Sequence, residues 1–103
     1  MKKVKITVMK KTFNKELADQ YGCSGIQPCH IYEVGQEFIS EEACKPDGIC
    51  EDAWTAFGKY VFALATGAEL FWTDWIDKKH VCINSCNDGL RPVIFKLEPI
   101  EDE

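Results

Sequence analysis

The sequence lacks the hydrophobic segments of membrane and secreted proteins. It contains no run of about 20 apolar residues, the length that a membrane-spanning helix needs. Its first residues alternate between basic and apolar side chains, whereas a secretory signal has an apolar run of about 7–15 residues. We therefore expect no membrane partner and a cytoplasmic location, where thiols are normally kept reduced.

The sequence also lacks the short motifs that identify common catalytic sites. It contains no glycine-rich phosphate loop, no His-Glu-x-x-His and no Ser-centred nucleophile elbow. Cys-x-x-Cys is absent too, which argues against a thioredoxin-like redox centre. The sequence therefore indicates no particular reaction, and it leaves open whether the protein is an enzyme.

The sequence has fewer basic than acidic residues. Twelve Lys and Arg residues stand against 17 Asp and Glu residues, which gives a net charge of −5. The lysines near the start alternate with Val4, Ile6 and Val8, as on the solvated side of a strand. Nucleic-acid binding needs a basic face that neutralises phosphates, so we expect no nucleic-acid partner.

The chain does have enough apolar material for one core. It has 103 residues, of which 46% are hydrophobic and 12% aromatic, and it shows no internal repeat. This length predicts a single domain over residues 1–103. A domain of this size does not need cross-links to be stable, so the cysteines are free for other roles.

Alternating apolar residues predict several strands. Residues 3–10 and 93–98 each place apolar side chains on one face, as a half-buried strand does. The outward side chains are mainly lysines in the first segment and glutamates near the end of the second, so we expect these two strands to pair. Shorter strands are predicted at 30–32, 37–39 and 81–84.

Two helices are predicted between these strands. A short one covers residues 15–21, with Asn14 as its N-cap and Gly22 as its stop. A long one begins at Glu51 and ends near Gly67, because apolar residues from Trp54 to Ala68 recur on one helical face. The sequence thus predicts an α+β fold with a small antiparallel or mixed sheet of four to five strands, one long helix and one short helix.

The six cysteines are the best candidates for chemistry. They form three local pairs, in or beside predicted turns: Cys23 and Cys29, Cys44 and Cys50, and Cys82 and Cys86. Five residues separate the first two pairs and three the last, so only the last has the two to four intervening residues typical of zinc sites. The spacing alone is a weak metal signal, but ligands from three loops can still meet in space.

Cys50 stands immediately before the long helix. A helix N-terminus favours a thiolate, whereas the neighbouring carboxylates of Glu51 and Asp52 oppose it. The net direction is open from the sequence, and a small buried or capping residue is an equally good interpretation of this position.

Further candidates surround these cysteines. His30 follows Cys29, but adjacent residues on an extended segment point to opposite faces. Arg91 follows the turn that contains Cys86 and Asp88, where its fork of donors suits an anion or a nearby carboxylate. Separately, Phe71, Trp72 and Trp75 place three large rings within five residues, which predicts a partly exposed apolar patch.

Four segments of the chain resemble a family of small bacterial and archaeal proteins of about this length, whose activity is not established. The segments are residues 2–8, 29–38, 48–54 and 86–93, and the last three contain Cys-x(5)-Gly-x-x-Phe, Cys-x-x-Ala-Trp and Cys-x-Asp-Gly-x-Arg-Pro-Val. The resemblance implies that Cys29, Cys50 and Cys86 are the family's cysteines and that Cys23, Cys44 and Cys82 are additions of this chain. His30 and Asn87 stand where the family usually has proline.

Three functions therefore compete. The first is a protein that binds zinc or an iron–sulfur cluster through Cys29, Cys50 and Cys86. Cys82 is the leading fourth ligand, and Cys44, a histidine or water are the alternatives. The second is a thiol redox or sulfur-handling protein in which Cys50 is the reactive thiol. The third is a non-enzymatic interaction module, in which the aromatic patch docks a protein partner or a second copy in a homo-oligomer.

Overall fold

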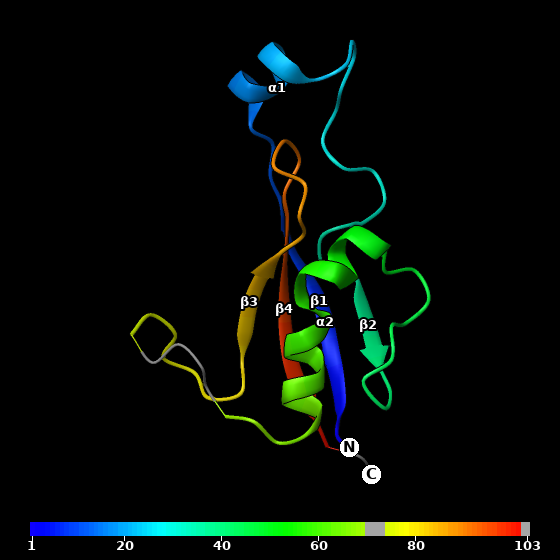
Figure 1. The fold of residues 1–103 in the computed structure, drawn as a ribbon, viewed down its shortest axis with the longest axis vertical. Helices are drawn as coiled ribbons and strands as arrows, with labels where there is room; N and C mark the ends of the chain where they lie inside the picture. The colour runs from blue at the N-terminus through cyan, green and yellow to red at the C-terminus, as the bar shows by residue number, and fades with distance from the viewer. Residues whose placement is uncertain (70–73, 102–103) are drawn as a thin grey trace.

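Four antiparallel strands and two helices make up the structure, a computed structural model that describes residues 1–69 and 74–101 (Figure 1). In chain order the elements are β1 (Lys3–Lys11), α1 (Lys15–Tyr21), β2 (Glu37–Ser40), α2 (Glu51–Ala65), β3 (Cys82–Ser85) and β4 (Val93–Ile100). This confirms the predicted α+β fold.

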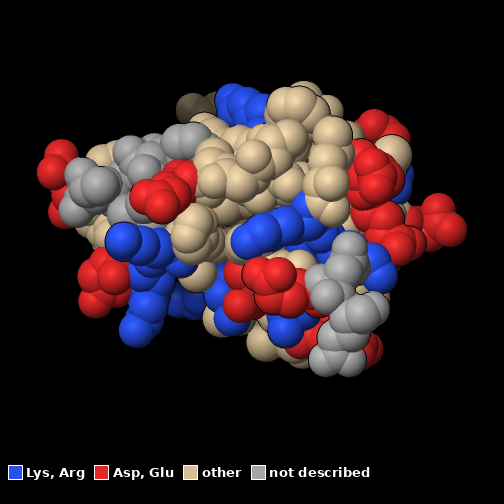
Figure 2. All heavy atoms as spheres, turned by 90° about the horizontal axis from the view of Figure 1, so that it is seen from below, with Lys and Arg blue, Asp and Glu red and all other residues tan. Residues whose placement is uncertain are grey.

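The sheet has the strand order β2-β1-β4-β3. The predicted pairing of the first and last strands is confirmed: β1 and β4 run antiparallel from Lys3 opposite Ile100 to Lys11 opposite Val93. A register shift between Val8 and Lys10 makes a bulge near the end of β1. The two edge strands have only four residues each, as is common for exposed sheet edges. Seen from the end that carries the chain termini, acidic and basic side chains lie next to one another on the surface (Figure 2).

One face of the sheet is covered by α2, and the core lies between them (Figure 1). The alternation in β1 and β4 directs Val4, Ile6, Val8, Phe95 and Leu97 toward the helix, and all are fully buried. The helix contributes Ala53, Phe57, Val61, Leu64 and Ala65 from one face. No helix in residues 1–69 and 74–101 has the length and hydropathy to cross a membrane.

The predicted strand at 30–32 is wrong. Residues 30–32 have no regular structure. The backbone hydrogen bonds between this loop and β1 involve Val8, whose carbonyl accepts the N–H of Gly35 and whose N–H donates to the carbonyl of Gln36. Gly35 has a φ of 91°, a conformation open mainly to glycine, and it turns the chain onto the sheet edge there. Because residues 30–32 do not pair with the sheet, the Tyr32 side chain can turn into the core.

Candidate functional site

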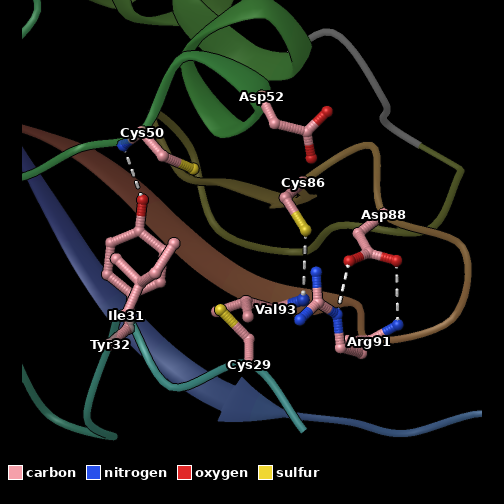
Figure 3. Close-up of a pocket in the computed structure, with 9 residues that line it drawn as sticks. All are labelled: Cys29, Ile31, Tyr32, Cys50, Asp52, Cys86, Asp88, Arg91 and Val93. Atoms are coloured by element: carbon pink, nitrogen blue, oxygen red, sulfur yellow. Dashed lines mark hydrogen bonds and ion pairs between the residues drawn. The ribbon is translucent and has the colours of Figure 1, made fainter. Parts of the chain in front are cut away.

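A pocket of about 330 Å³ is the candidate site (Figure 3). The segments that line it meet at the end of the sheet opposite the chain termini (Figure 1). Four segments meet there: the loop before β2, the start of α2, the turn between β3 and β4, and the first residue of β4. Its lining consists of Cys29, Ile31, Tyr32, Cys50, Asp52, Cys86, Asp88, Arg91 and Val93.

Three of the six cysteines line this pocket. Cys50 is the N-cap residue of α2, and its side chain makes no capping hydrogen bond. Cys86 follows β3, and its sulfur accepts a hydrogen bond from the backbone N–H of Val93 at 3.4 Å. Cys29 comes from the loop on the other side. All three are free thiols and half-buried, so the pocket presents three thiols from three separate loops.

Tyr32 joins the pocket to the core. Its ring is 1% exposed and packs edge-on against Phe95, with ring centroids 5.2 Å apart. Its hydroxyl oxygen accepts the backbone N–H of Cys50 at 2.8 Å. Burial raises the pKa of this hydroxyl most, and a hydrogen bond with the Cys50 side chain raises it further. The hydrogen bond from the Cys50 backbone lowers the pKa, but burial outweighs it, and the nearby Cys50 and Cys29 add smaller increases. Tyr32 thus keeps its proton beside two thiols.

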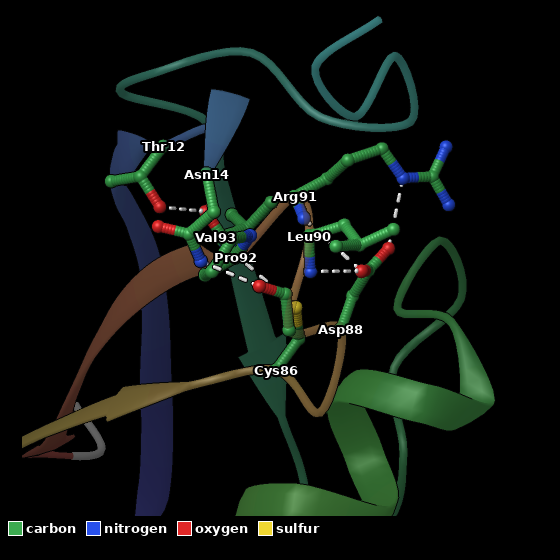
Figure 4. A network of polar contacts seen from close by, with 9 residues as sticks. Thr12, Asn14, Cys86, Asp88, Leu90, Arg91, Pro92 and Val93 are labelled. Carbon is green, nitrogen blue, oxygen red and sulfur yellow. Dashed lines mark hydrogen bonds and ion pairs between the residues drawn. The ribbon is translucent and has the colours of Figure 1, made fainter. Parts of the chain in front are cut away.

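Asp88 organises the turn on the opposite wall (Figure 4). One carboxylate oxygen accepts the backbone N–H groups of Leu90 and Arg91 at 2.9 and 3.1 Å, and the other accepts Nε–H of Arg91 at 2.9 Å. Burial raises the pKa of Asp88, but these three hydrogen bonds and the guanidinium charge outweigh it and lower the pKa overall. The carboxylate is therefore ionised and fixes the direction of Arg91.

Cys82 does not belong to this site. It lies on β3 under α2, is 2% exposed, and is not among the residues that line the pocket. Its pKa is raised to about 11 because burial disfavours the thiolate. The predicted fourth ligand is therefore placed in the core as a small apolar residue.

The other predicted site residues lie outside the pocket lining. Cys23 and Cys44 are exposed, and His30 is exposed beside a separate hollow. Cys23 is nevertheless near enough to Arg91 for its charge to raise the pKa of that guanidinium, after the larger effects of Asp88. Trp75 is 67% exposed. Phe71 and Trp72 lie outside the described residues.

Metal-binding geometry is not formed in the described part of the chain. No three His, Cys, Asp or Glu side chains in residues 1–69 and 74–101 are placed so that they could hold one ion. The three pocket thiols supply the right donor type for zinc or an iron–sulfur cluster. Sharing one ion would require their side chains to turn toward one another.

Comparisons with known proteins add no relative. No family model, no curated protein and no solved structure matches this chain. The pocket is therefore interpreted from its own residues.

Sequence reasoning missed two polar residues of the pocket. It placed Tyr32 in a strand and treated Asp52 only as a charge at a helix start, yet both line the pocket. No sequence signal marks Tyr32. For Asp52 a signal existed, because it lies two residues after Cys50 in the first turn of the same helix.

Proposed function

We propose that the pocket is a thiol site, with Cys50 as the reactive thiol and Cys29 and Cys86 as its possible partners. The observation that carries the proposal is the meeting of three free, half-buried thiols from three loops in one pocket. A protein that needed cysteine only as a small core residue would bury it as it buries Cys82.

The local structure suits a nucleophilic role for Cys50. Its side chain is not used in capping, and it lies where the N-terminal dipole of α2 favours negative charge. The Tyr32 hydroxyl already accepts the Cys50 backbone N–H, so its own proton is free to be donated to the sulfur. A reactive thiolate would thus be held between a helix terminus and a hydroxyl donor.

The proposed reaction is thiol–disulfide exchange. The Cys50 thiolate attacks one sulfur of a small disulfide, forms a mixed disulfide and releases the other half as a thiolate. Cys29 or Cys86 then displaces the bound half, which leaves a disulfide in the protein. The substrate disulfide is reduced to two thiols while two protein thiols are oxidised, so electrons balance.

The test is to map the adducts formed by oxidised glutathione on the reduced native protein. We expect a glutathione adduct on Cys50 when both Cys29 and Cys86 are replaced by Ser, and a protein disulfide involving Cys50 when they are present. The matched control is Cys44→Ser, which removes an exposed thiol outside the pocket. Modification confined to Cys23 and Cys44 would contradict the proposal.

A second candidate is a thiolate metal site formed by the same three cysteines. It is favoured by the number of thiols, because three protein ligands and one exogenous ligand are the usual set of an open zinc site. Elemental analysis and a visible absorption spectrum of the purified protein test it. A bound metal that is lost in the Cys29→Ser, Cys50→Ser and Cys86→Ser variants, but kept in Cys44→Ser, would favour this candidate over thiol exchange.

A further inference from the structure

Arg91 reaches the thiol pocket as an oriented cation. It lies two residues before β4, on the turn fixed by Asp88, and it lines the same pocket as Cys29 and Cys86 (Figure 3). The hydrogen bond and the charge of Asp88 raise the pKa of Arg91 most, and Cys29 and Cys23 add smaller contributions. The side chain is 36% exposed, so a ligand in solution can reach it.

The hydrogen bonds of Arg91 leave most of its donors available. Guanidinium has five N–H groups in a planar fork, and only Nε–H is used, in the 2.9 Å bond to Asp88. Among the pocket residues drawn in Figure 3, the hydrogen bond of the guanidinium runs from Nε to Asp88, and the two terminal NH2 groups make none. Asp88 is itself held by two backbone N–H groups, so it fixes the fork in one direction.

We infer that the pocket takes a small carboxylate-bearing ligand, whose carboxylate is held by the terminal NH2 groups of Arg91 while its reactive atom faces a pocket thiol. The inference rests on the proposed function, because it names the ligand class of that site. A planar carboxylate matches the guanidinium fork with two parallel hydrogen bonds. The volume of about 330 Å³ is at the lower end for ligand pockets and therefore fits a small molecule.

Asp52 sets the limit on the charge of this ligand. Its carboxylate lines the same pocket from the first turn of α2, on the side of Cys86 (Figure 3). It repels a second negative group, so the pocket selects a ligand with one anionic end directed at Arg91. Removing Asp52 should then strengthen the preference for anions, whereas removing Arg91 should abolish it.

The test compares two alkylating reagents that differ in charge. Iodoacetate and iodoacetamide both lose iodide as a thiolate sulfur attacks their CH2 carbon, but only iodoacetate carries a carboxylate. Peptide mapping gives the rate at each cysteine, and the iodoacetate-to-iodoacetamide ratio at the pocket thiols is divided by the ratio at exposed Cys44. This normalisation removes the intrinsic difference between the reagents.

We expect the normalised ratio to fall about fivefold in Arg91→Gln, because a charge-assisted pair of hydrogen bonds is lost. Arg91→Lys keeps the charge without the fork and should give an intermediate ratio, and Asp52→Asn should raise the ratio. Circular dichroism and a urea unfolding curve check that each variant is folded. The two substitutions at opposite walls thus move the ratio in opposite directions.

The results separate this inference from the function on which it rests. If the pocket thiols react with both reagents but the normalised ratio is the same in Arg91→Gln and Arg91→Lys as in the unmodified protein, the carboxylate preference is overturned and the thiol site stands. If neither reagent modifies a pocket thiol as fast as Cys44, the proposed thiol site itself fails.

Discussion

The core and the thiol pocket use cysteine differently, and the difference shows how this molecule separates stability from reactivity. The described residues that form the core between the sheet and α2 are apolar or buried away from water. Cys82 is one of them, and burial raises its pKa. At the loop end, Cys29, Cys50 and Cys86 are half-buried beside Tyr32 and Arg91. The same residue type thus serves as core filling in one region and as an accessible thiol in the other.

Replacing a core residue should affect stability most. Phe95 is fully buried and packs against Tyr32 and Phe57, with ring centroids 5.2 and 5.0 Å apart. Phe95→Ala should lower the free energy of unfolding by about 3–5 kcal/mol, measured by urea denaturation, because it removes buried apolar surface and leaves a cavity. Ile83 on the neighbouring strand is 45% exposed and is the matched control. Equal losses in Phe95→Ala and Ile83→Ala would break the distinction between the core and the surface of the sheet.

Alkaline pH should test the buried thiol. The pKa of Cys82 rises from 9.0 to about 11 on folding, so between these pH values the unfolded chain loses the proton that the folded protein keeps. The unfolded state then binds fewer protons, and the free energy of unfolding falls as pH rises, by at most about 1.4 kcal/mol per pH unit. Below pH 9 this contribution is constant.

The measurement for Cys82 is a series of urea unfolding curves from pH 8 to pH 11. Cys82→Ala should lose part of the downward slope, although its stability is lower throughout because of the cavity. The slope that remains in the variant comes from the other titratable groups, which both proteins share. A variant with the same slope as the unmodified protein would show that burial does not raise the pKa of Cys82.

Tyr32→Phe should give the smallest effect on stability and the clearest effect on the pocket. The ring contacts with Phe38 and Phe95 remain, but the backbone N–H of Cys50 loses its acceptor. We expect a loss of about 1 kcal/mol in the free energy of unfolding. Alkylation of Cys50 by iodoacetamide should slow relative to Cys44, because the thiolate loses a hydroxyl donor. An unchanged relative rate would confine Tyr32 to the core.

The sequence predicts the layered part of this fold well because its signals are local. Alternation over residues 3–10 and 93–98 defines two strands, and the outward charges predict that they pair, as β1 and β4 do. The helical face from Trp54 to Ala68 likewise predicts α2, which ends at Ala65, close to the predicted end near Gly67. Residues 30–32 were assigned to a strand wrongly, because a short apolar segment looks the same whether its backbone pairs or only its side chain is buried.

The site was less predictable, because it is made by segments that are distant in the sequence. Cysteine spacing did not show which thiols meet, and the resemblance alone selected Cys29, Cys50 and Cys86, which line one pocket. The pair Cys82 and Cys86 has the spacing typical of zinc sites, but β3 places Cys82 in the core, away from the pocket that Cys86 lines. Side-chain direction in a short edge strand depends on register, which no local pattern in this segment specifies.

The place of β1 at the centre of the sheet has a consequence for synthesis. Its partner on one side, β2, follows within the first 40 residues, but its other partner, β4, ends at Ile100. During synthesis, the edge of β1 that will pair with β4 therefore stays unpaired until β4 has been made. Unpaired backbone groups along an apolar strand can pair with another chain and cause aggregation. Lys3, Lys5, Lys10 and Lys11 flank the apolar positions of that strand as charged gatekeepers. The lysines on the solvated side of β1 are thus placed to oppose aggregation of the nascent chain until β4 pairs with this strand.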